Sequence, residues 1–240
     1  MKLFLPKQHG AWAMLIIPFW LGAVASTIIW QHIPFFLGWL LLYLATYPML
    51  LLFKKKKIPF YTKWTLIYLL PALILLLIPL WTRPGIAYFG FAMVPFFLLN
   101  SYFSSRNRDR ALLNDMSAVV VFSIAGLASS FLGGGEVSKQ AWMVFITSII
   151  FFMGSTFYVK TMIREKKSTT YKWVSWGYHL AAVCSFLFAG EWLIAFAFLP
   201  SLGRAIYFYG KNYSVKKVGI LEIVNAVLFF IIIFFWIVQK

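Results

Sequence analysis

The sequence predicts an all-α, polytopic transmembrane helical bundle with about nine spans. Hydrophobic residues make up 62% of the 240-residue chain, whereas charged residues make up only 12%. Soluble domains carry about 45–50% apolar and about 25% charged residues, so this chain has too little polar surface for a water-soluble fold. In addition, the apolar residues fall into nine runs that approach the length needed to cross a bilayer.

The nine runs follow from the thickness of the membrane. A bilayer core of about 30 Å takes about 20 apolar residues in a helix that rises 1.5 Å per residue. The predicted spans cover residues 11–30, 33–53, 64–81, 86–103, 116–132, 141–158, 173–188, 192–209 and 218–238. The first run continues to Trp30 and is longer than the apolar core of a signal peptide, so we expect it to be a span. Little sequence remains outside the runs, so residues 1–240 are expected to form one membrane domain.

The connections between the runs alternate in charge. Short connections follow the odd-numbered runs, and basic connections follow the even-numbered runs, starting at Lys54, Arg106, Lys160 and Lys211. Only Arg83, Lys139 and Lys240 fall on the other side, which leaves 19 of the 22 basic residues on one side. Because basic loops stay in the cytoplasm, we expect the N-terminus inside and the C-terminus outside. Only an odd number of spans preserves this alternation.

Two spans carry small residues four positions apart. These are Gly22 with Ser26 in the first span and Gly126 with Ser130 in the fifth. Small residues on one face of a helix let two backbones approach closely in a membrane. We interpret both pairs as helix-packing contacts rather than parts of a site.

Ionisable side chains within a span are unfavourable in hydrocarbon, so each is a candidate functional residue. Arg204 lies near the inner end of the eighth run, and Glu222 lies just inside the ninth. At 1.5 Å per residue, both are about 6–8 Å below the inner boundary. We therefore expect an ion pair between adjacent helices, which fits a structural clamp as well as a functional site.

The polar residues near the inner boundary form the predicted ligand site. If they converge, they line a cavity open to the cytoplasm, where arginine can bind phosphate or carboxylate and apolar walls can accept a tail. A packing role for His179 and a topological role for the inner arginines are the alternatives. No catalytic residue is assigned. The candidate set is His9, Asn100, Arg110, Asn114, Asp115, Lys160, Arg164, Glu165, His179, Arg204, Lys217 and Glu222.

The motifs of several other site classes are absent from the sequence. It has no P-loop, no GxGxxG and no HExxH motif. Cys184 is the only cysteine, which excludes an intrachain disulfide and a CxxC metal site. The net charge of +16 would suggest nucleic acid in a soluble protein, but here too little polar surface remains. We expect no metal site and no nucleic-acid partner; the expected partner is the lipid bilayer.

Four segments resemble the YwiC-like family of bacterial membrane proteins. They are residues 6–14 (PKQHGAWAM), residues 110–115 (RALLND), residues 158–166 (YVKTMIREK), and Arg204 followed by Lys217, Gly219 and Glu222. The resemblance extends over the whole chain. It implies a multi-pass protein of the bacterial cytoplasmic membrane and does not imply a particular reaction.

The layout is also similar to that of the UbiA-type membrane prenyltransferases, which have nine helices with polar inner loops. Those enzymes hold a prenyl diphosphate through Mg²⁺ and motifs of the Asn-Asp-x-x-Asp kind. The nearest stretch here is residues 100–104 (NSYFS), where serines stand in place of the aspartates. Because Mg²⁺ prefers carboxylate oxygens, the resemblance leaves enzyme activity open, and Mg²⁺ is expected only in an active prenyltransferase.

Three functions remain open on the sequence. The first is a UbiA-like bundle that binds an isoprenoid, a quinone or an anionic lipid in the inner-facing cavity, with or without catalysis. The second is a small-molecule transporter, but transporter sites lie near the bilayer midplane, which is apolar here. The third is an accessory membrane subunit without a ligand. A cavity beside Arg204 and Glu222 favours the first, a midplane site the second and a filled bundle the third.

Overall fold

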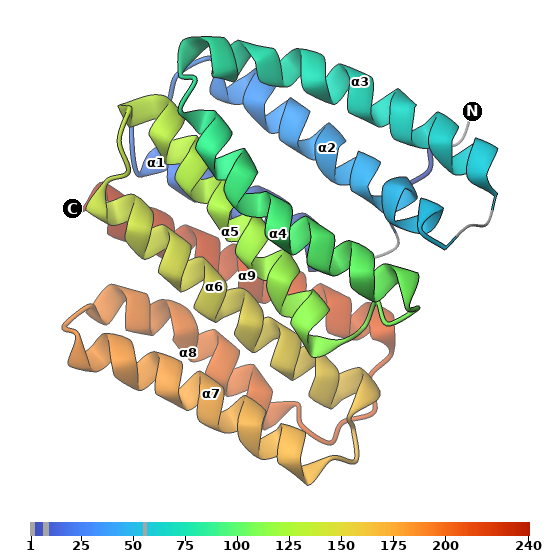
Figure 1. The fold of residues 1–240 in the computed structure, drawn as a ribbon. Helices are drawn as coiled ribbons and strands as arrows, with labels where there is room; N and C mark the ends of the chain where they lie inside the picture. The colour runs from blue at the N-terminus through green and yellow to red at the C-terminus, as the bar shows by residue number, and fades with distance from the viewer. Residues whose placement is uncertain (1–2, 7–9, 55–56) are drawn as a thin grey trace. The chain divides into compact units, whose positions relative to one another are not determined.

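The computed structural model describes residues 3–6, 10–54 and 57–240, and among these it contains helices and turns but no strand (Figure 1). Nine α-helices follow one another in the described residues: α1 (Gly10–Val24), α2 (His32–Leu52), α3 (Ile58–Thr82), α4 (Ile86–Ser105), α5 (Leu112–Gly134), α6 (Lys139–Val159), α7 (Thr169–Phe188), α8 (Trp192–Tyr207) and α9 (Val215–Val238). A π-helical segment, η1 (Lys160–Arg164), continues α6. The predicted all-α class is confirmed.

Six of the described helices are long and apolar enough to cross a membrane. They are α2, α3, α4, α5, α6 with its η1 extension, and α9. The helices α1 and α8 are apolar but have only 15 and 16 residues, which corresponds to about 22–24 Å of helix. The structure therefore supports a multi-pass membrane protein, while the number and direction of the crossings stay predictions.

The first helix is shorter than predicted. It ends at Val24, whereas the apolar run continues to Trp30. Residues 27–29 are all β-branched, and such side chains lose rotational freedom in a helix. The backbone N–H of Ile29 instead donates to Nδ1 of His32 at 3.1 Å, at the start of α2. Hydropathy does not reveal this break because the residues on both sides of it are equally apolar.

Other helix ends differ from the predicted runs by a few residues. The helix α3 begins at Ile58 rather than at residue 64, and Pro59 occupies its first turn. Proline suits that position because the backbone N–H of the first turn has no helical partner. The helix α7 begins at Thr169 rather than at residue 173, and the Ser168 hydroxyl caps it by accepting from the Tyr171 N–H. Turn chemistry, which an apolar-run criterion ignores, sets both starts.

The chain divides into two compact units, residues 1–145 and 146–240, which are called the N-terminal unit and the C-terminal unit below. In the N-terminal unit α5 is central: about half of its residues are buried, and α1 and α4 pack against it. The helices α2 and α3 run side by side as a second pair (Figure 1). The single membrane domain expected from the sequence stays a prediction.

The backbones of α1 and α5 lie in direct contact. A Cβ atom added to Gly22 would lie 2.0 Å from the carbonyl oxygen of Gly126, and one added to Gly126 would lie 2.6 Å from that of Pro18. Neither position has room for a side chain. The packing role predicted for these two glycines is therefore confirmed, and the two predicted motifs contact each other.

Two polar side chains from neighbouring segments bind carbonyl oxygens near the C-terminal end of α5. His32 is fully buried: its Nδ1 accepts from the Ile29 N–H, and its Nε2 donates to the carbonyl oxygen of Ser129 in α5 at 2.9 Å. Arg83 donates from Nε to the carbonyl oxygen of Leu132 in the last turn of α5 at 2.7 Å. Helix C-termini carry partial negative charge, so a cation is favourable there. Neither residue is among the candidates predicted from the sequence.

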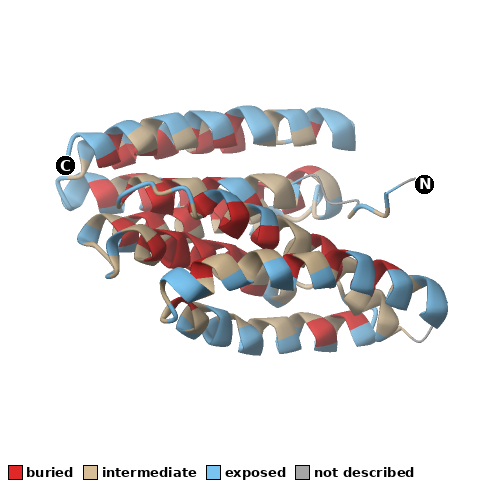
Figure 2. Ribbon diagram, turned by 90° about the horizontal axis from the view of Figure 1, so that it is seen from above, coloured by how far each residue is buried: buried red, intermediate tan, exposed pale blue. Residues whose placement is uncertain are grey.

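Exposed residues occur along the length of several helices and not only at their ends (Figure 2). Many of them are large and apolar. On α3 the exposed apolar side chains follow one face of the helix: Leu66, Ile67, Leu70, Leu73, Ile74, Leu77 and Trp81. The helices α4 and α9 carry similar faces. Such continuous apolar surfaces are unfavourable in water and are typical of helices that contact lipid.

The C-terminal unit consists of α7, α8 and α9 with the part of α6 that follows residue 145. Here α8 packs against both α7 and α9. The ring of Phe151 on α6 stacks on that of Phe229 on α9, with centroids 4.0 Å apart, and Phe186 on α7 stacks on Phe198 on α8 at 5.3 Å. These stacked rings form an aromatic core between the four helices.

Candidate functional site

Polar side chains from all four helices meet inside the C-terminal unit. Except for Glu222, whose side chain is 14% exposed, all of them are buried. We call this set the polar cluster; it consists of Ser155 and Tyr158 on α6, Ser175 and His179 on α7, Ser201 and Arg204 on α8, and Glu222 and Asn225 on α9.

An ion pair joins α8 to α9 in the polar cluster. The guanidinium of Arg204 pairs through Nη1 with Oε1 of Glu222, which is the contact predicted from the sequence. Its Nη2 donates to the hydroxyl of Ser155 on α6 at 3.0 Å. Its central carbon lies 4.4 Å from the ring centroid of Tyr158, in cation–π geometry. One arginine thus connects three helices, and Glu222 neutralises its charge.

A second polar contact lies one helical turn from the ion pair. The side-chain amide nitrogen of Asn225 donates to the hydroxyl of Ser201 at 2.9 Å. Asn225 follows Glu222 by three residues, and Ser201 precedes Arg204 by three residues, so both contacts use the same face of each helix. Two successive polar contacts therefore set the register of α8 against α9.

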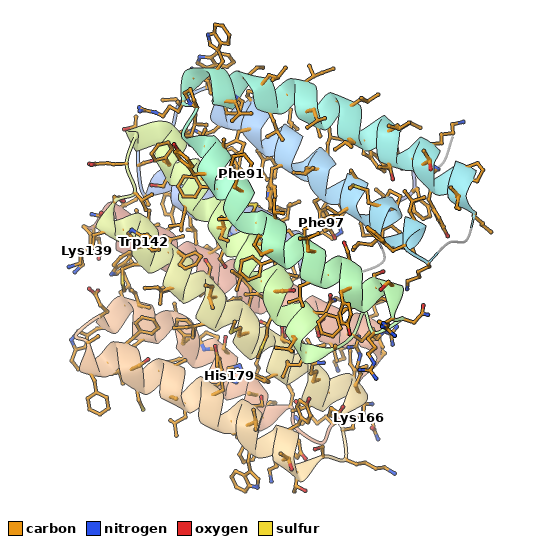
Figure 3. The ribbon with its side chains drawn as sticks, viewed as in Figure 1. Phe91, Phe97, Lys139, Trp142, Lys166 and His179 are labelled. Carbon is orange, nitrogen blue, oxygen red and sulfur yellow. The ribbon has the colours of Figure 1, made fainter. Side chains whose placement is uncertain are left out.

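His179 projects from α7 (labelled in Figure 3) and packs on Gly154 of α6. Its Nδ1 lies 2.6 Å from the carbonyl oxygen of Ser175. A carbonyl only accepts, so Nδ1 carries the proton and Nε2 is left as an acceptor. A Cβ atom on Gly154 would lie 3.0 Å from Nε2, so the glycine leaves room for the ring.

Four buried polar atoms of the cluster have no hydrogen-bond partner among the described residues. They are Tyr158 Oη, Ser175 Oγ, His179 Nε2 and Arg204 Nε. Leaving a buried donor or acceptor unpaired costs about 1–3 kcal/mol. Other unpaired atoms occur elsewhere in the described residues, but this group combines a phenol, an imidazole and a guanidinium. The cluster therefore combines satisfied polar contacts with buried donors and acceptors that are left unpaired.

One strip of α6 lies beneath these atoms. Arg204 contacts both Ser155 and Tyr158, and the His179 ring packs on Gly154, the residue before Ser155. Residues 154–158 make up little more than one helical turn, or about 6 Å of helix. The unpaired groups of α7 and α8 thus face the same short segment of α6.

The helix α6 changes its geometry after Val159, one residue beyond Tyr158. In η1 the backbone N–H of Glu165 donates to the carbonyl oxygen of Lys160 at 2.7 Å, five residues earlier. The predicted run ended at residue 158, so this continuation was missed. Such π-helical segments are rare and are frequent at functional sites. Of the predicted site residues, Lys160 is buried in η1, Arg164 ends it and is exposed, and Glu165 follows it.

The other predicted site residues lie in the N-terminal unit or at the surface. Asn100 accepts from the hydroxyl of Ser117 at 3.0 Å, and Asn114 donates to the carbonyl oxygen of Asp109 at 2.8 Å. Arg110 lies just before α5, Asp115 lies in its first turn, and Lys217 contacts the ring of Tyr213 at the start of α9. His9 lies outside the described residues. The structure thus brings together His179, Arg204 and Glu222, while one cavity lined by all candidates stays a prediction.

The stretch similar to the prenyltransferase motif does not suit Mg²⁺. Ser101 donates to the carbonyl oxygen of Phe97 and Ser104 to that of Leu50, at 2.9 and 3.1 Å. The oxygen of Asn100 accepts from Ser117, and no carboxylate occurs in residues 100–104. Mg²⁺ favours carboxylates and an open octahedral site. Within the described ranges, no three His, Cys, Asp or Glu side chains come together to hold a metal ion.

Sequence reasoning missed Ser155, Tyr158, Ser175 and Ser201. Serine hydroxyls are common in membrane helices, and Tyr158 ended a predicted span, where interfacial tyrosine is ordinary. The spacing of Ser155, three residues before Tyr158, was a signal available in the sequence. To interpret this spacing, one would have to know which side of α6 faces α8.

The chain is similar to two bacterial proteins over nearly its whole length. Residues 5–130 match the model of a family described as "YwiC-like protein". A Bacillus subtilis protein described as "Uncharacterized protein YwiC" is 47% identical over 95% of this chain and 96% of its own length. A Haemophilus influenzae protein described as "Uncharacterized protein" is 38% identical over 97% of this chain and 98% of its own length. No solved structure matches the chain.

Proposed function

The chain belongs to the YwiC-like family, and we propose that it is a multi-pass protein of the bacterial cytoplasmic membrane that binds a lipid-soluble ligand in the polar cluster. The ligand is an isoprenoid, a quinone or a lipid, whose polar head meets the cluster while its tail lies among apolar side chains. The single observation that carries the proposal is the ion pair of the buried Arg204 with the partly buried Glu222, together with the unpaired polar atoms of the cluster.

The membrane setting is supported by the helices themselves. Six described helices are long and apolar enough to cross, and both relatives are bacterial. For the orientation, we propose nine crossings with the N-terminus inside, based on the distribution of basic residues. Two of the three basic residues that fall on the other side have local partners: Arg83 at the end of α5, and Lys240, which lies 3.4 Å from Glu191. Their positions are thus explained without a change of topology.

This topology has a direct test. Single cysteines at Lys57 and at Glu136, in a Cys184→Ser background, are treated with a membrane-impermeant thiol reagent in intact cells. We expect labelling at position 136 and none at position 57 until the cells are opened. Labelling of position 57 from outside would overturn the orientation.

Ligand binding is supported by energetics. A polar cluster inside apolar helices is tolerated when its members are paired, and half-satisfied clusters are unfavourable. The Arg204–Glu222 and Ser201–Asn225 contacts give some polar groups of the cluster their partners. Tyr158 Oη and His179 Nε2 have no hydrogen-bond partner among the described residues. A bound head group gives these atoms partners. Binding thereby removes the free-energy cost of leaving these two atoms unpaired in the unliganded protein.

The proposal is tested by native mass spectrometry of protein purified in mild detergent. The informative variant is Arg204→Gln with Glu222→Gln, which removes both charges and leaves no charge unpaired. The matched control is Arg83→Gln, which changes an arginine in the N-terminal unit. We expect wild type and control to retain the same amphiphile and the double variant to lose it while circular dichroism shows an intact helical fold. Equal retention in all three, or no retained amphiphile in wild type, would contradict the proposal.

A further inference from the structure

The charges of the polar cluster cancel. Arg204 and Glu222 are in contact, and the remaining members are hydroxyl, amide and imidazole groups. Lys160, the other buried cation of this unit, lies beyond Tyr158 in η1 and has interactions of its own. A third charge brought to a neutral pair in a low-dielectric interior is desolvated without a counter-ion of its own. An anionic head group would have to compete with Glu222 for Arg204.

The unpaired atoms include both donors and an acceptor. Arg204 Nε can only donate, whereas the hydroxyls of Tyr158 and Ser175 can donate or accept. His179 Nε2 is an acceptor because Nδ1 carries the proton. A phosphate oxygen satisfies donors but leaves the imidazole lone pair without a partner. An alcohol oxygen has two lone pairs, so it can accept from both Arg204 and Tyr158, and its O–H donates to His179.

We infer that the ligand of this site carries an uncharged head group with a hydroxyl, as an isoprenoid alcohol does, and not a phosphate or carboxylate. This inference rests on the proposed function, because it names the chemistry of the ligand for the same site. It replaces the anionic head that arginine alone suggested in the sequence.

The side of α9 next to the cluster offers a route from the lipid. Glu222 is the most exposed member of the cluster, and its neighbours Ile223 and Val224 are exposed apolar residues. Asn225, one residue further along, is buried. Ile223 borders Glu222 on the exposed side of α9, so a tail that lies against Ile223 brings its head beside Glu222.

The test uses three probes with one tail: farnesol, farnesyl methyl ether and farnesyl diphosphate. Binding to the full-length protein in mild detergent is measured by isothermal titration calorimetry. We expect farnesol to bind most tightly, the ether to bind about tenfold more weakly for want of a donor, and the diphosphate to bind more weakly than farnesol. A tenfold change in Kd corresponds to about 1.4 kcal/mol.

Two phenylalanine substitutions supply the structural readout. Tyr158→Phe removes a hydroxyl with no partner in the described structure, so the unliganded protein should melt at the same temperature or higher. The affinity for farnesol should fall about fivefold to tenfold, as expected for the loss of one hydrogen bond. Tyr68→Phe is the matched control: its hydroxyl donates to Phe4 at 3.1 Å in the N-terminal unit. That variant should melt at a lower temperature and bind farnesol unchanged.

The outcomes separate the inference from the proposed function. Tighter binding of farnesyl diphosphate than of farnesol, weakened by the Arg204→Gln, Glu222→Gln variant, overturns the inference and leaves the proposed function standing. Farnesol binding that Tyr158→Phe does not weaken also overturns the inference. No saturable binding of any probe, together with no amphiphile retained on purification, overturns both.

Discussion

The two units use the same polar residue types in different ways. In the N-terminal unit both ring nitrogens of His32 are hydrogen-bonded, and Arg83 donates to a helix end. In the C-terminal unit the second nitrogen of His179 and Nε of Arg204 have no partner among the described residues. The residue type of a buried histidine or arginine therefore does not show whether its role is structural or functional. What distinguishes a structural residue from a candidate binding residue is whether its last donor or acceptor is already occupied.

The units also differ in how their helices are held together. In the N-terminal unit α1 and α5 touch through glycine backbones, a contact that depends on shape alone. In the C-terminal unit α8 and α9 are joined by a buried ion pair and an amide–hydroxyl contact, which depend on chemical partners. Each mode predicts a different response to substitution, and four experiments probe the difference.

The largest effect is expected when one partner of the ion pair is removed. Arg204→Ala should lower the free energy of unfolding by about 3–5 kcal/mol, because Glu222 is left with an uncompensated charge. The double change Arg204→Met with Glu222→Leu should recover most of this loss. Thermal unfolding of wild type, Arg204→Met, Glu222→Leu and the double variant gives the coupling. Simple additivity of the two single losses would show that the pair does not stabilise the unit.

The next effect concerns the glycine contact of the N-terminal unit. Gly22→Ala should lower the free energy of unfolding by about 1–3 kcal/mol, because its Cβ would lie on the carbonyl oxygen of Gly126 and force α1 from α5. Gly203→Ala on α8 is the control, since an added Cβ there meets nothing within 4 Å. Thermal unfolding in detergent compares the two. Equal melting temperatures would contradict the close helix contact.

A third experiment compares the two histidines. His32→Phe removes two partners, so the Ile29 N–H and the Ser129 carbonyl lose their bonds, and a loss of about 1–3 kcal/mol is expected. His179→Phe frees only the Ser175 carbonyl and removes an unpaired acceptor, so its loss should be smaller. Chemical unfolding of the unliganded variants measures both. A larger loss for His179→Phe would reverse the distinction between the two units.

The smallest effect is expected at the end of α5. Arg83→Met keeps the aliphatic length of the side chain but removes its bond to Leu132 and its charge beside the helix C-terminus. A loss of about 0.5–2 kcal/mol follows from these two contributions. Hydrogen exchange of the last turn of α5 is the sensitive measurement. Unchanged protection of that turn would show that the arginine does not cap the helix.

The sequence was sufficient for the helices and for one contact of the site. Hydropathy located all nine described helices, and depth along the runs paired Arg204 with Glu222. It could not identify Tyr158 and Ser155 as partners of Arg204. In a soluble helix an apolar stripe shows which side is buried, but in a membrane both the lipid side and the core side are apolar. The rotation of each helix, which decides its neighbours, is therefore weakly encoded.

The π-helical segment after Tyr158 has a consequence for changes in chain length. Its turn closes over five residues rather than four, so it holds one residue more than a regular α-helical turn. Deletion of one residue within 160–164 would restore a regular turn while leaving residues 155 and 158 in place. The same deletion earlier in α6 would rotate every later residue by about 100° and separate Tyr158 from Arg204. This segment is thus where α6 can lose a residue without disturbing the polar cluster.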